Sequence, residues 1–253
     1  MGPQYLMKIS SKNQKILIFS DVHQDIDKLT KIIYHESADI NICLGDWFDS
    51  HFIDKNEDVE KTAIFLKNYL ADGNITLFGN HDLHYFFANK YTICSGYADR
   101  KAQVIDEIFG KDKETIIDKF NWFIFIDEFL CTHAGLHYNF LSPTVLNSED
   151  LYEYLTIQGN DANIKIRTKQ FHWFYGAGYS RCGDQPKGGI VWLDFDREFA
   201  PLKIMPQIFG HTYRRKGKIQ THCKTENYCI DTNLNEWMTI TNGKMEIKNY
   251  KNL

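Results

Sequence analysis

The stretch KILIFSDVH, residues 15–23, begins a pattern that recurs in INICLGDWFD at 40–49 and in ITLFGNHD at 75–82. Each occurrence is a short apolar run followed by a polar loop, which is typical of a buried strand and the loop that leaves it. Between them, residues 25–34 and 57–70 place apolar side chains at helical spacing. This β-α-β-α-β order predicts a parallel sheet with crossover helices.

Polar residues follow each of these three strands. Asp21 and His23 follow the first, Asp46 follows the second, and Asn80 follows the third. Ligands gather at the carboxyl ends of the strands in open α/β sheets, so we expect these groups at one edge. Two carboxylates there repel unless a cation compensates them. A helix cap or a turn explains one such aspartate, but it does not explain three loops of this kind.

Two further apolar runs end in a histidine. CTHAG carries His133, and FGHT carries His211. A lone histidine is more often structural than a metal ligand, and a D-x-H tripeptide such as the one at Asp21 is mostly chance. Five strand-end elements of this type in one chain nevertheless favour a metal site.

The rest of the chain is β-rich and harder to interpret. Helices are expected within 97–119, 149–157 and 161–175, and a polar loop at 176–189. Short strands are expected at 120–126, 129–132, 190–193, 207–209, 218–222, 228–231, 238–241 and 245–248. We expect one domain over residues 15–253, after an N-terminal extension at 1–14, part of which can derive from cloning.

Composition narrows the class of protein. The 253 residues carry a net charge of −4 with a pI of about 6.2, which gives no global reason to bind nucleic acid or an anionic membrane. No apolar run is long enough to span a membrane. None of the six cysteines forms a CxxC pair, and Cys43 and Cys131 lie in apolar runs. We therefore expect free thiols and a cytoplasmic protein.

The order DVH, GDWFD, GNHD, THAG and FGHT resembles the calcineurin-like metallophosphoesterases, over about residues 15–241. The last two elements, with VWLD at 191–194 and IDT at 230–232, most resemble the phosphoprotein phosphatase branch. Its relatives include dinucleoside tetraphosphatases and bacterial or phage phosphatases. The resemblance implies an α/β fold: a four-layer α-β-β-α sandwich of two mixed sheets flanked by helices.

The resemblance also implies a dinuclear metal centre in which one aspartate bridges the two ions. Its ligands would be Asp21, His23, Asp46, Asn80, His133 and His211. Asp46 would bridge the two ions. Asp21 and His23 would bind the first ion, and Asn80, His133 and His211 would bind the second. Mixed nitrogen and oxygen ligands suit Mn²⁺ first, with Fe, Zn²⁺ or Mg²⁺ as alternatives.

Two more residues acquire catalytic roles from the resemblance. His81 would protonate the leaving oxygen, and Asp49 would orient His81 and sustain its charge. A hydroxide shared by two metal ions would attack the phosphorus directly. General acid catalysis of this kind is typically worth about 10²–10⁴ in rate.

The phosphate-binding arginine of the phosphoprotein phosphatases is missing from its usual place after Asp49, where this chain has Ser50 and His51. Arg181, Arg214 and Arg215 are the candidates to replace it, because a guanidinium grips phosphate bidentately. Solvated loop arginines are the more ordinary alternative for any one of them.

Tyr213 stands where many superfamily members have a second histidine, which favours the phosphatase-like branch. Tyr85, Phe86 and Phe87 could form an aromatic wall, although a packed helix start is the more usual role. We expect a phosphomonoesterase acting on a phosphoprotein, a nucleotide or a nucleic-acid end. A phosphodiesterase or dinucleoside polyphosphate hydrolase is the first alternative, and an inactive scaffold the second.

Overall fold

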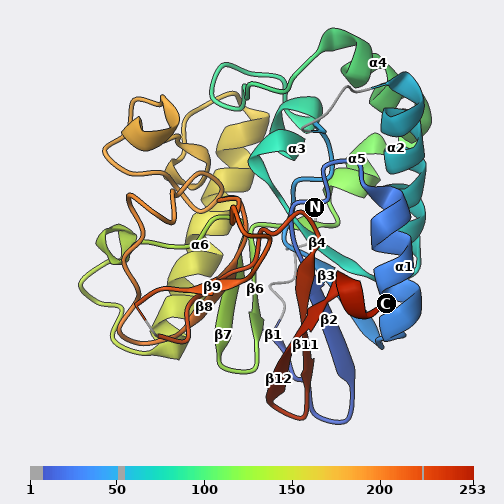
Figure 1. Ribbon diagram of the computed structural model, residues 1–253. Coiled ribbons are helices and arrows are strands. Elements are labelled where there is room, and N and C mark those ends of the chain that lie inside the picture. The colour runs from blue at the N-terminus through green and yellow to red at the C-terminus, as the bar shows by residue number, and fades with distance from the viewer. Residues whose placement is uncertain (1–7, 51–54, 224) are drawn as a thin grey trace.

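The computed structural model describes residues 8–50, 55–223 and 225–253. Two six-stranded mixed sheets lie face to face, and helices cover the outer face of each (Figure 1). This arrangement confirms the predicted α-β-β-α sandwich. His51 lies outside the described residues.

The first sheet has the strand order β12-β11-β2-β3-β4-β5. Its strands are β2 (Lys15–Phe19), β3 (Ile40–Cys43), β4 (Ile75–Leu77), β5 (Phe120–Asn121), β11 (Glu236–Thr241) and β12 (Lys244–Asn249). Strands β2 to β5 are parallel, whereas β11 and β12 are antiparallel additions beside β2. The carboxyl ends of β2, β3 and β4 therefore meet at one edge, as the sequence predicts.

The second sheet has the order β1-β6-β7-β8-β10-β9. Its strands are β1 (Lys8–Ile9), β6 (Phe123–Ile126), β7 (Phe129–Thr132), β8 (Gln207–Phe209), β9 (Gln220–Thr221) and β10 (Tyr228–Cys229). Strand β1 comes from the expected N-terminal extension and pairs in parallel with β6. Just after β1, the backbone N–H of Ser11 donates to Asp127 over 2.9 Å, so this part of the extension is anchored to the sheet.

The helices lie on both sides of the two sheets (Figure 1). The α-helices are α1 (Ile26–Glu36), α2 (Asn56–Ala71), α3 (Asn80–Phe86), α4 (Asp99–Phe109), α5 (Lys113–Ile117) and α6 (Ser148–Arg167). Short 3-10 turns occupy Gly110–Asp112, Tyr138–Phe140, Trp173–Tyr175, Tyr179–Arg181 and Tyr250–Asn252. Figure 1 shows α1 and α2 beside the first sheet and α6 alone beside the second.

The structure differs from the predicted elements in several places. The run expected as one strand at 120–126 is divided between β5 in the first sheet and β6 in the second. Residues 148–167 form a single helix, α6, where two helices were expected, and residues 168–172 leave it. Gly159 lies inside α6 where the helix packs against β6, and a Cβ there would make only an ordinary contact, 3.5 Å from the ring of Phe123. The strand expected at 190–193 is instead a loop, held by the bond from Val191 N–H to Phe174 O (3.3 Å).

The alternation of side chains along β2 explains how one strand serves two layers. Ile16 and Ile18 pack between the two sheets, whereas Leu17 and Phe19 pack outward under the helices. Side chains of a strand point alternately to its two faces, so an all-apolar strand is stable only when both faces are covered. The four residues are almost fully buried.

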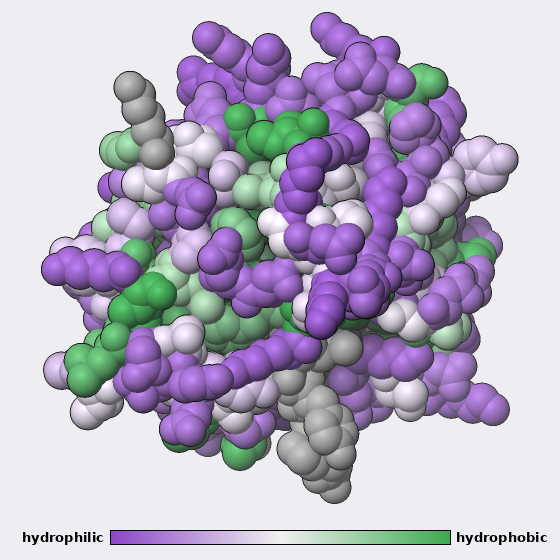
Figure 2. Space-filling model, turned by 90° about the horizontal axis from the view of Figure 1, so that it is seen from below, coloured by the Kyte–Doolittle hydropathy of each residue, from purple (hydrophilic) through white to green (hydrophobic). Residues whose placement is uncertain are grey.

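The end of the sheets that carries the β6–β7 and β11–β12 turns is shown in Figure 2. Hydrophilic side chains spread over most of that face, with apolar groups scattered among them. All six cysteines are free thiols, of which Cys182 and Cys223 are exposed. None of the helices in the described ranges is long and apolar enough to cross a membrane.

Candidate active site and metal centre

Backbone hydrogen bonds tie the strand-end loops to one another. The N–H groups of Asp21 and His23 donate to the carbonyls of Gly45 and Asp46 over 3.1 and 3.0 Å. The N–H of His211 donates to the carboxylate of Asp21 at 3.0–3.1 Å. Loops from both sheets thus converge on one place.

Five of the eight candidate metal-binding and catalytic residues adopt a left-handed backbone, which non-glycine residues rarely do. The φ angles are 56° for Asp21, 44° for His23, 60° for Asp46, 65° for Asp49 and 67° for His211. Such conformations cost on the order of 1–3 kcal/mol each and persist where the surroundings enforce them. Here they turn five functional side chains toward one centre.

Two glycines allow the loops to approach so closely. A Cβ on Gly79 would lie 2.1 Å from Oδ1 of Asp46, and a Cβ on Gly210 would lie 2.1 Å from Oδ2 of Asp21. No side chain fits in either position, because real contacts of this kind are longer than 3 Å. The glycines beside Asn80 and His211 are therefore required by packing at the site.

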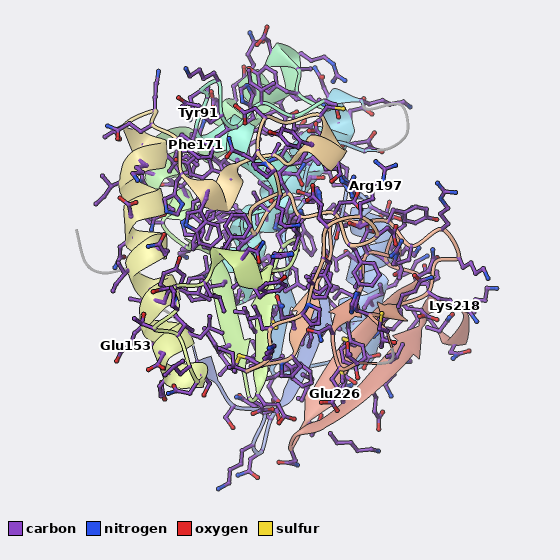
Figure 3. All side chains as sticks on the ribbon, turned by 90° about the vertical axis from the view of Figure 1, so that its left-hand side faces the viewer. Tyr91, Glu153, Phe171, Arg197, Lys218 and Glu226 are labelled. Atoms are coloured by element: carbon purple, nitrogen blue, oxygen red, sulfur yellow. The ribbon has the colours of Figure 1, made fainter. Side chains whose placement is uncertain are left out.

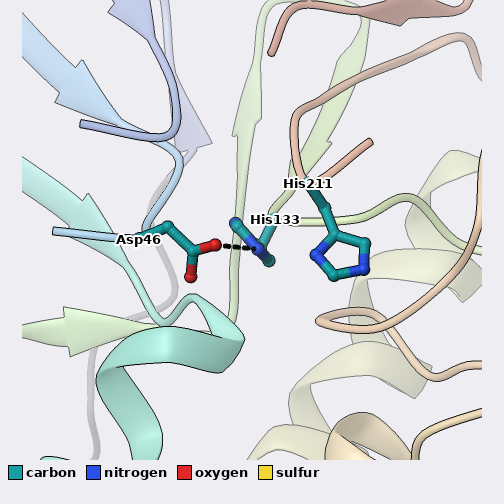
Figure 4. Close-up of side chains that lie close together, drawn as sticks. All are labelled: Asp46, His133 and His211. Carbon is teal, nitrogen blue, oxygen red and sulfur yellow. Dashed lines mark ion pairs between the residues drawn. The ribbon is translucent and has the colours of Figure 1, made fainter. Parts of the chain in front are cut away.

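Two groups of side chains that could hold a metal ion share Asp46. One consists of Asp21, His23 and Asp46, and the other of Asp46, His133 and His211. Within each group the ligand atoms lie within 4.8 Å of one another. Figure 4 shows the second group, in which Nε2 of His133 lies 3.4 Å from Oδ2 of Asp46.

Asn80 belongs to the same cluster. Its Oδ1 lies 3.1 Å from Nε2 of His133, so its amide oxygen faces the second group. The structure thus brings together all six residues that the sequence predicts as ligands.

The rings of His133 and His23 are oriented by hydrogen bonds from Nδ1 to backbone carbonyls. Nδ1 of His133 donates to Leu44 O at 2.8 Å, and Nδ1 of His23 donates to Asp49 O at 2.8 Å. Since a carbonyl oxygen only accepts, Nδ1 carries a proton in both rings, and Nε2 is the nitrogen that faces the carboxylate of Asp46. Nε2 of His211 is buried and has no hydrogen-bond partner among the described residues. These nitrogens and carboxylates fit a divalent ion.

The carboxylates interact strongly through their charges. Burial works to raise the pKa of Asp46, but the nearby imidazoles of His133 and His81 outweigh it and hold that pKa well below its usual value. Burial and the charge of Asp46 raise the pKa of Asp21. Burial lowers the pKa of His133, yet Asp46 and Asp21 together raise it to about 9. The cluster therefore favours positive charge beside its carboxylates.

His81 lies next to the cluster with the geometry of a proton donor. Its backbone N–H donates to Asp46 at 2.9 Å, and its Nδ1 donates to Oδ2 of Asp49 at 2.8 Å. Burial works to lower the pKa of His81, but the charge of Asp46 and the bond to Asp49 raise it well above its usual value. A protonated His81 is the form that can donate a proton.

Two buried aspartates were not predicted as site residues. Asp82 accepts from the N–H groups of Asp46, Trp47 and Gly79 at 2.8–3.0 Å, so it fastens two loops together. Burial and then the charge of Asp46 raise its pKa to about 7. Asp231 is almost fully buried, and burial and Asp21 raise its pKa well above the usual value. In the sequence, the only indications that these two residues belong to the site are that Asp82 follows His81 and that Asp231 lies in the IDT motif at 230–232.

Four of the candidate metal ligands line a cleft of about 920 Å³: His23, Asp46, Asn80 and His211. Arg181 lines this cleft, where its guanidinium meets Asp194 at 3.0 Å and Thr212 Oγ1 at 3.0 Å. Arg214 is buried in a bidentate pair with Asp196, at 2.7 and 3.0 Å. Arg215 is exposed, and neither of the two is among the residues that line the cleft. This geometry favours Arg181 as the substrate contact.

One wall of the cleft is aromatic. Tyr91, Phe171 and Tyr175 line it, and the rings of Tyr91 and Phe171 are 5.6 Å apart (Figure 3). Ile93 extends the wall and is 60% exposed. The three aromatic residues after the Asn80 loop, 85–87, are buried in the core instead, at the C-terminal end of α3 rather than at a helix start.

The profile of the calcineurin-like phosphoesterases matches residues 14–215. The chain belongs to this family. It is accordingly a metal-dependent phosphoesterase, a hydrolase of phosphate ester bonds, which confirms the class of enzyme that the motifs predict. No curated protein sequence matches the chain.

Solved structures share the family fold at low sequence identity. A cold-active protein-tyrosine phosphatase of a Shewanella species is 15% identical, with a TM-score of 0.62, over 99% of this chain and 82% of its own. A Saccharomyces cerevisiae serine/threonine phosphatase similar to human phosphatase PP5 is 14% identical, with a TM-score of 0.55, over 97% and 83%. A candidate diadenosine tetraphosphatase is 15% identical, with a TM-score of 0.52, over 97% and 98%.

Proposed function

We propose that this phosphoesterase is a phosphomonoesterase with a centre for two divalent ions, Mn²⁺ first. The observation that carries the proposal is that Asp46 belongs to both groups of metal-binding side chains. A carboxylate has two oxygens and can serve two ions at once. Two ions bound there would lower the pKa of a water molecule and polarise the phosphoryl oxygens.

The protein's own residues supply the remaining chemistry. Nε2 of His81 gives its proton to the leaving oxygen, and Asp49 holds the other ring nitrogen of His81 at 2.8 Å. Asp82 holds the loops of Asp46 and Gly79 together by accepting hydrogen bonds from three backbone N–H groups. The strained backbone of the loops is thereby prearranged, so little reorganisation is required when the substrate binds.

In this proposal Arg181 binds the substrate phosphate. A guanidinium has five N–H donors, and the contacts to Asp194 and Thr212 engage two of its nitrogens. Its charge is also close to a metal ligand, since Arg181 contributes, after burial and His133, to the lowered pKa of His211. Arg181 could thus take over the role of the arginine that is missing after Asp49.

Replacing Arg181 by Ala should lower kcat/KM for a phosphomonoester by roughly 10- to 100-fold, because a charge-assisted hydrogen bond is worth about 1.5–3 kcal/mol. The loss should appear mainly as a higher KM. Initial rates over a range of substrate concentrations measure it. Arg215→Ala is the comparison variant, and an equal loss in that variant would contradict the assignment to Arg181.

The proposed class of reaction is tested by hydrolysis of p-nitrophenyl phosphate and bis(p-nitrophenyl) phosphate, with Mn²⁺ and with chelator. We expect turnover that requires Mn²⁺, with kcat/KM at least about tenfold higher for the monoester, because a dianionic phosphate interacts more strongly with two cations and Arg181. A preference for the diester would reject the monoesterase. No turnover of either ester with several metal ions would favour an inactive scaffold.

A dinucleoside polyphosphate hydrolase is the second candidate, and the shape of the cleft favours it. A volume of about 920 Å³ exceeds what one phosphate group needs, and the wall of Tyr91 and Phe171 offers ring faces to a base. Comparing rates on a dinucleoside tetraphosphate and on a phosphopeptide distinguishes the two candidates.

A further inference from the structure

A lysine is buried behind the candidate proton donor. Lys101 belongs to α4, its side chain is only 3% exposed, and its Nζ contacts Oδ1 of Asp49. Lysine is almost never fully buried unless its charge is paired, because removing an ammonium ion from water costs several kcal/mol. The partner it has here is the carboxylate that orients His81.

The two oxygens of Asp49 have different partners. Oδ1 accepts from the hydroxyl of Tyr85 at 2.5 Å and from Lys101. Oδ2 accepts from Nδ1 of His81 at 2.8 Å. The backbone of Gly96 packs closely against the same carboxylate, because a Cβ at Gly96 would lie 2.4 Å from Cγ of Asp49. The carboxylate is therefore held at Oδ1 by Tyr85 and Lys101, whereas Oδ2 faces His81 and also lies 3.6 Å from Sγ of Cys94.

The donors around Asp49 also favour the ionised form of its carboxyl group. Burial works to raise the pKa of Asp49, but the bonds from His81, Lys101 and Tyr85 outweigh it and lower that pKa. Asp49 is thus an anion that accepts at both oxygens, and the orientation of its plane depends on all of these donors.

We propose that Lys101 is a positioning residue for the reaction: by holding Oδ1 of Asp49 it fixes Oδ2 against His81, and so sets the direction of Nε2 toward the leaving group. The inference rests on the proposed function, in which His81 is the proton donor. It also gives α4 a part in the site, although Lys101 is 52 residues from Asp49 in the sequence.

The alternative is that Lys101 only attaches α4 to the rest of the fold. The leaving group distinguishes the two roles. p-Nitrophenolate leaves without a proton, whereas an alkyl alcohol must be protonated as it leaves. A misdirected His81 therefore slows the alkyl ester selectively, and a loosened fold slows both esters equally.

The experiment compares kcat of the wild type and Lys101→Met on p-nitrophenyl phosphate and on an alkyl phosphate, both with Mn²⁺. We expect the variant to lose on the order of 10²-fold on the alkyl ester, as a small misplacement of a catalytic group can do, and less than about tenfold on the aryl ester. Lys67→Met is the matched control, because it removes a lysine that pairs with Asp112 at 2.8 Å, outside the cleft lining. It should behave as the wild type on both esters.

Tyr85→Phe provides a second test that does not depend on tolerance of the lysine variant, since it removes a single hydroxyl from the same oxygen of Asp49. It should show the same selective loss in a smaller degree. A crystal structure of Lys101→Met grown without metal is a readout apart from activity. We expect the Asp49 carboxylate to be rotated and its 2.8 Å bond to His81 broken.

Equal losses on the two esters, or an unchanged Asp49–His81 bond with unchanged kinetics, would overturn the role of Lys101 and leave the proposed function intact. A wild type that hydrolyses neither ester would overturn the proposed function, and this inference with it.

Discussion

Asp46→Asn should reduce turnover of a phosphomonoester by on the order of 10³-fold or more. Asparagine keeps the size of the side chain and one carbonyl oxygen, but it removes the negative charge that lies between two groups of metal-binding residues. Charge stabilisation by a metal ion in the transition state is worth several kcal/mol, and about 4 kcal/mol corresponds to a factor of 10³. The measurement is kcat with saturating Mn²⁺, together with the metal content of the purified protein.

The control for this prediction is Asp27→Asn. Asp27 is an exposed aspartate of α1 that pairs with Lys61 at 2.7 Å, outside the cleft lining, so its loss should leave kcat within about twofold of the wild type. Asp46→Asn should bind less than two ions per chain. Full activity with two ions bound would exclude Asp46 as the bridge.

The strand-end residues could be predicted from the sequence because their positions follow from local rules. Asp21, Asp46 and Asn80 each come directly after a short apolar run, and parallel strands bring their carboxyl ends to one edge. These residues can therefore be identified without knowledge of contacts between distant parts of the chain. The same holds for His133, which follows β7 as closely.

The walls of the cleft could not be predicted in this way. Tyr91 and Phe171 are 80 residues apart in the numbering and meet only because two long loops fold over the same edge of the sheets. In the sequence, Lys101 is one more charged residue of the helix expected within 97–119, and its burial depends on a contact with Asp49 in a distant loop. Side-chain contacts between distant loops leave no periodicity in the sequence.

The left-handed backbone at the site is a further feature without a sequence signal. Asp and His belong with Asn to the non-glycine residues that adopt it most often, but they do so only in a small minority of cases, and here Asp21, His23 and His211 all adopt it. Local preferences for these residues point to ordinary strand ends or turns, and the surrounding hydrogen bonds override them. Sequence rules therefore identify these residues but not their backbone conformation, because strain is tolerated where function uses it.

Removing divalent ions with a chelator should lower the melting temperature by about 10 °C. The centre buries Asp21, Asp46 and Asp231 close together, and burial with mutual repulsion raises the pKa of Asp21 and of Asp231. Cations that bind the folded chain but not the unfolded chain stabilise it by about 4 kcal/mol at a thousand times the Kd. For a chain of this size each kcal/mol shifts the melting temperature by roughly 2–4 °C.

Thermal unfolding with EDTA and with increasing Mn²⁺ measures this effect. Asp46→Asn should respond to Mn²⁺ by less than half of the wild-type shift, whereas Asp27→Asn should respond fully, because only the former belongs to both ligand groups. Ca²⁺ should stabilise less than Mn²⁺ at equal concentration, since it prefers oxygen ligands and the centre offers three imidazoles. A wild type that melts at one temperature under all of these conditions would show that the side chains converge without binding a metal ion.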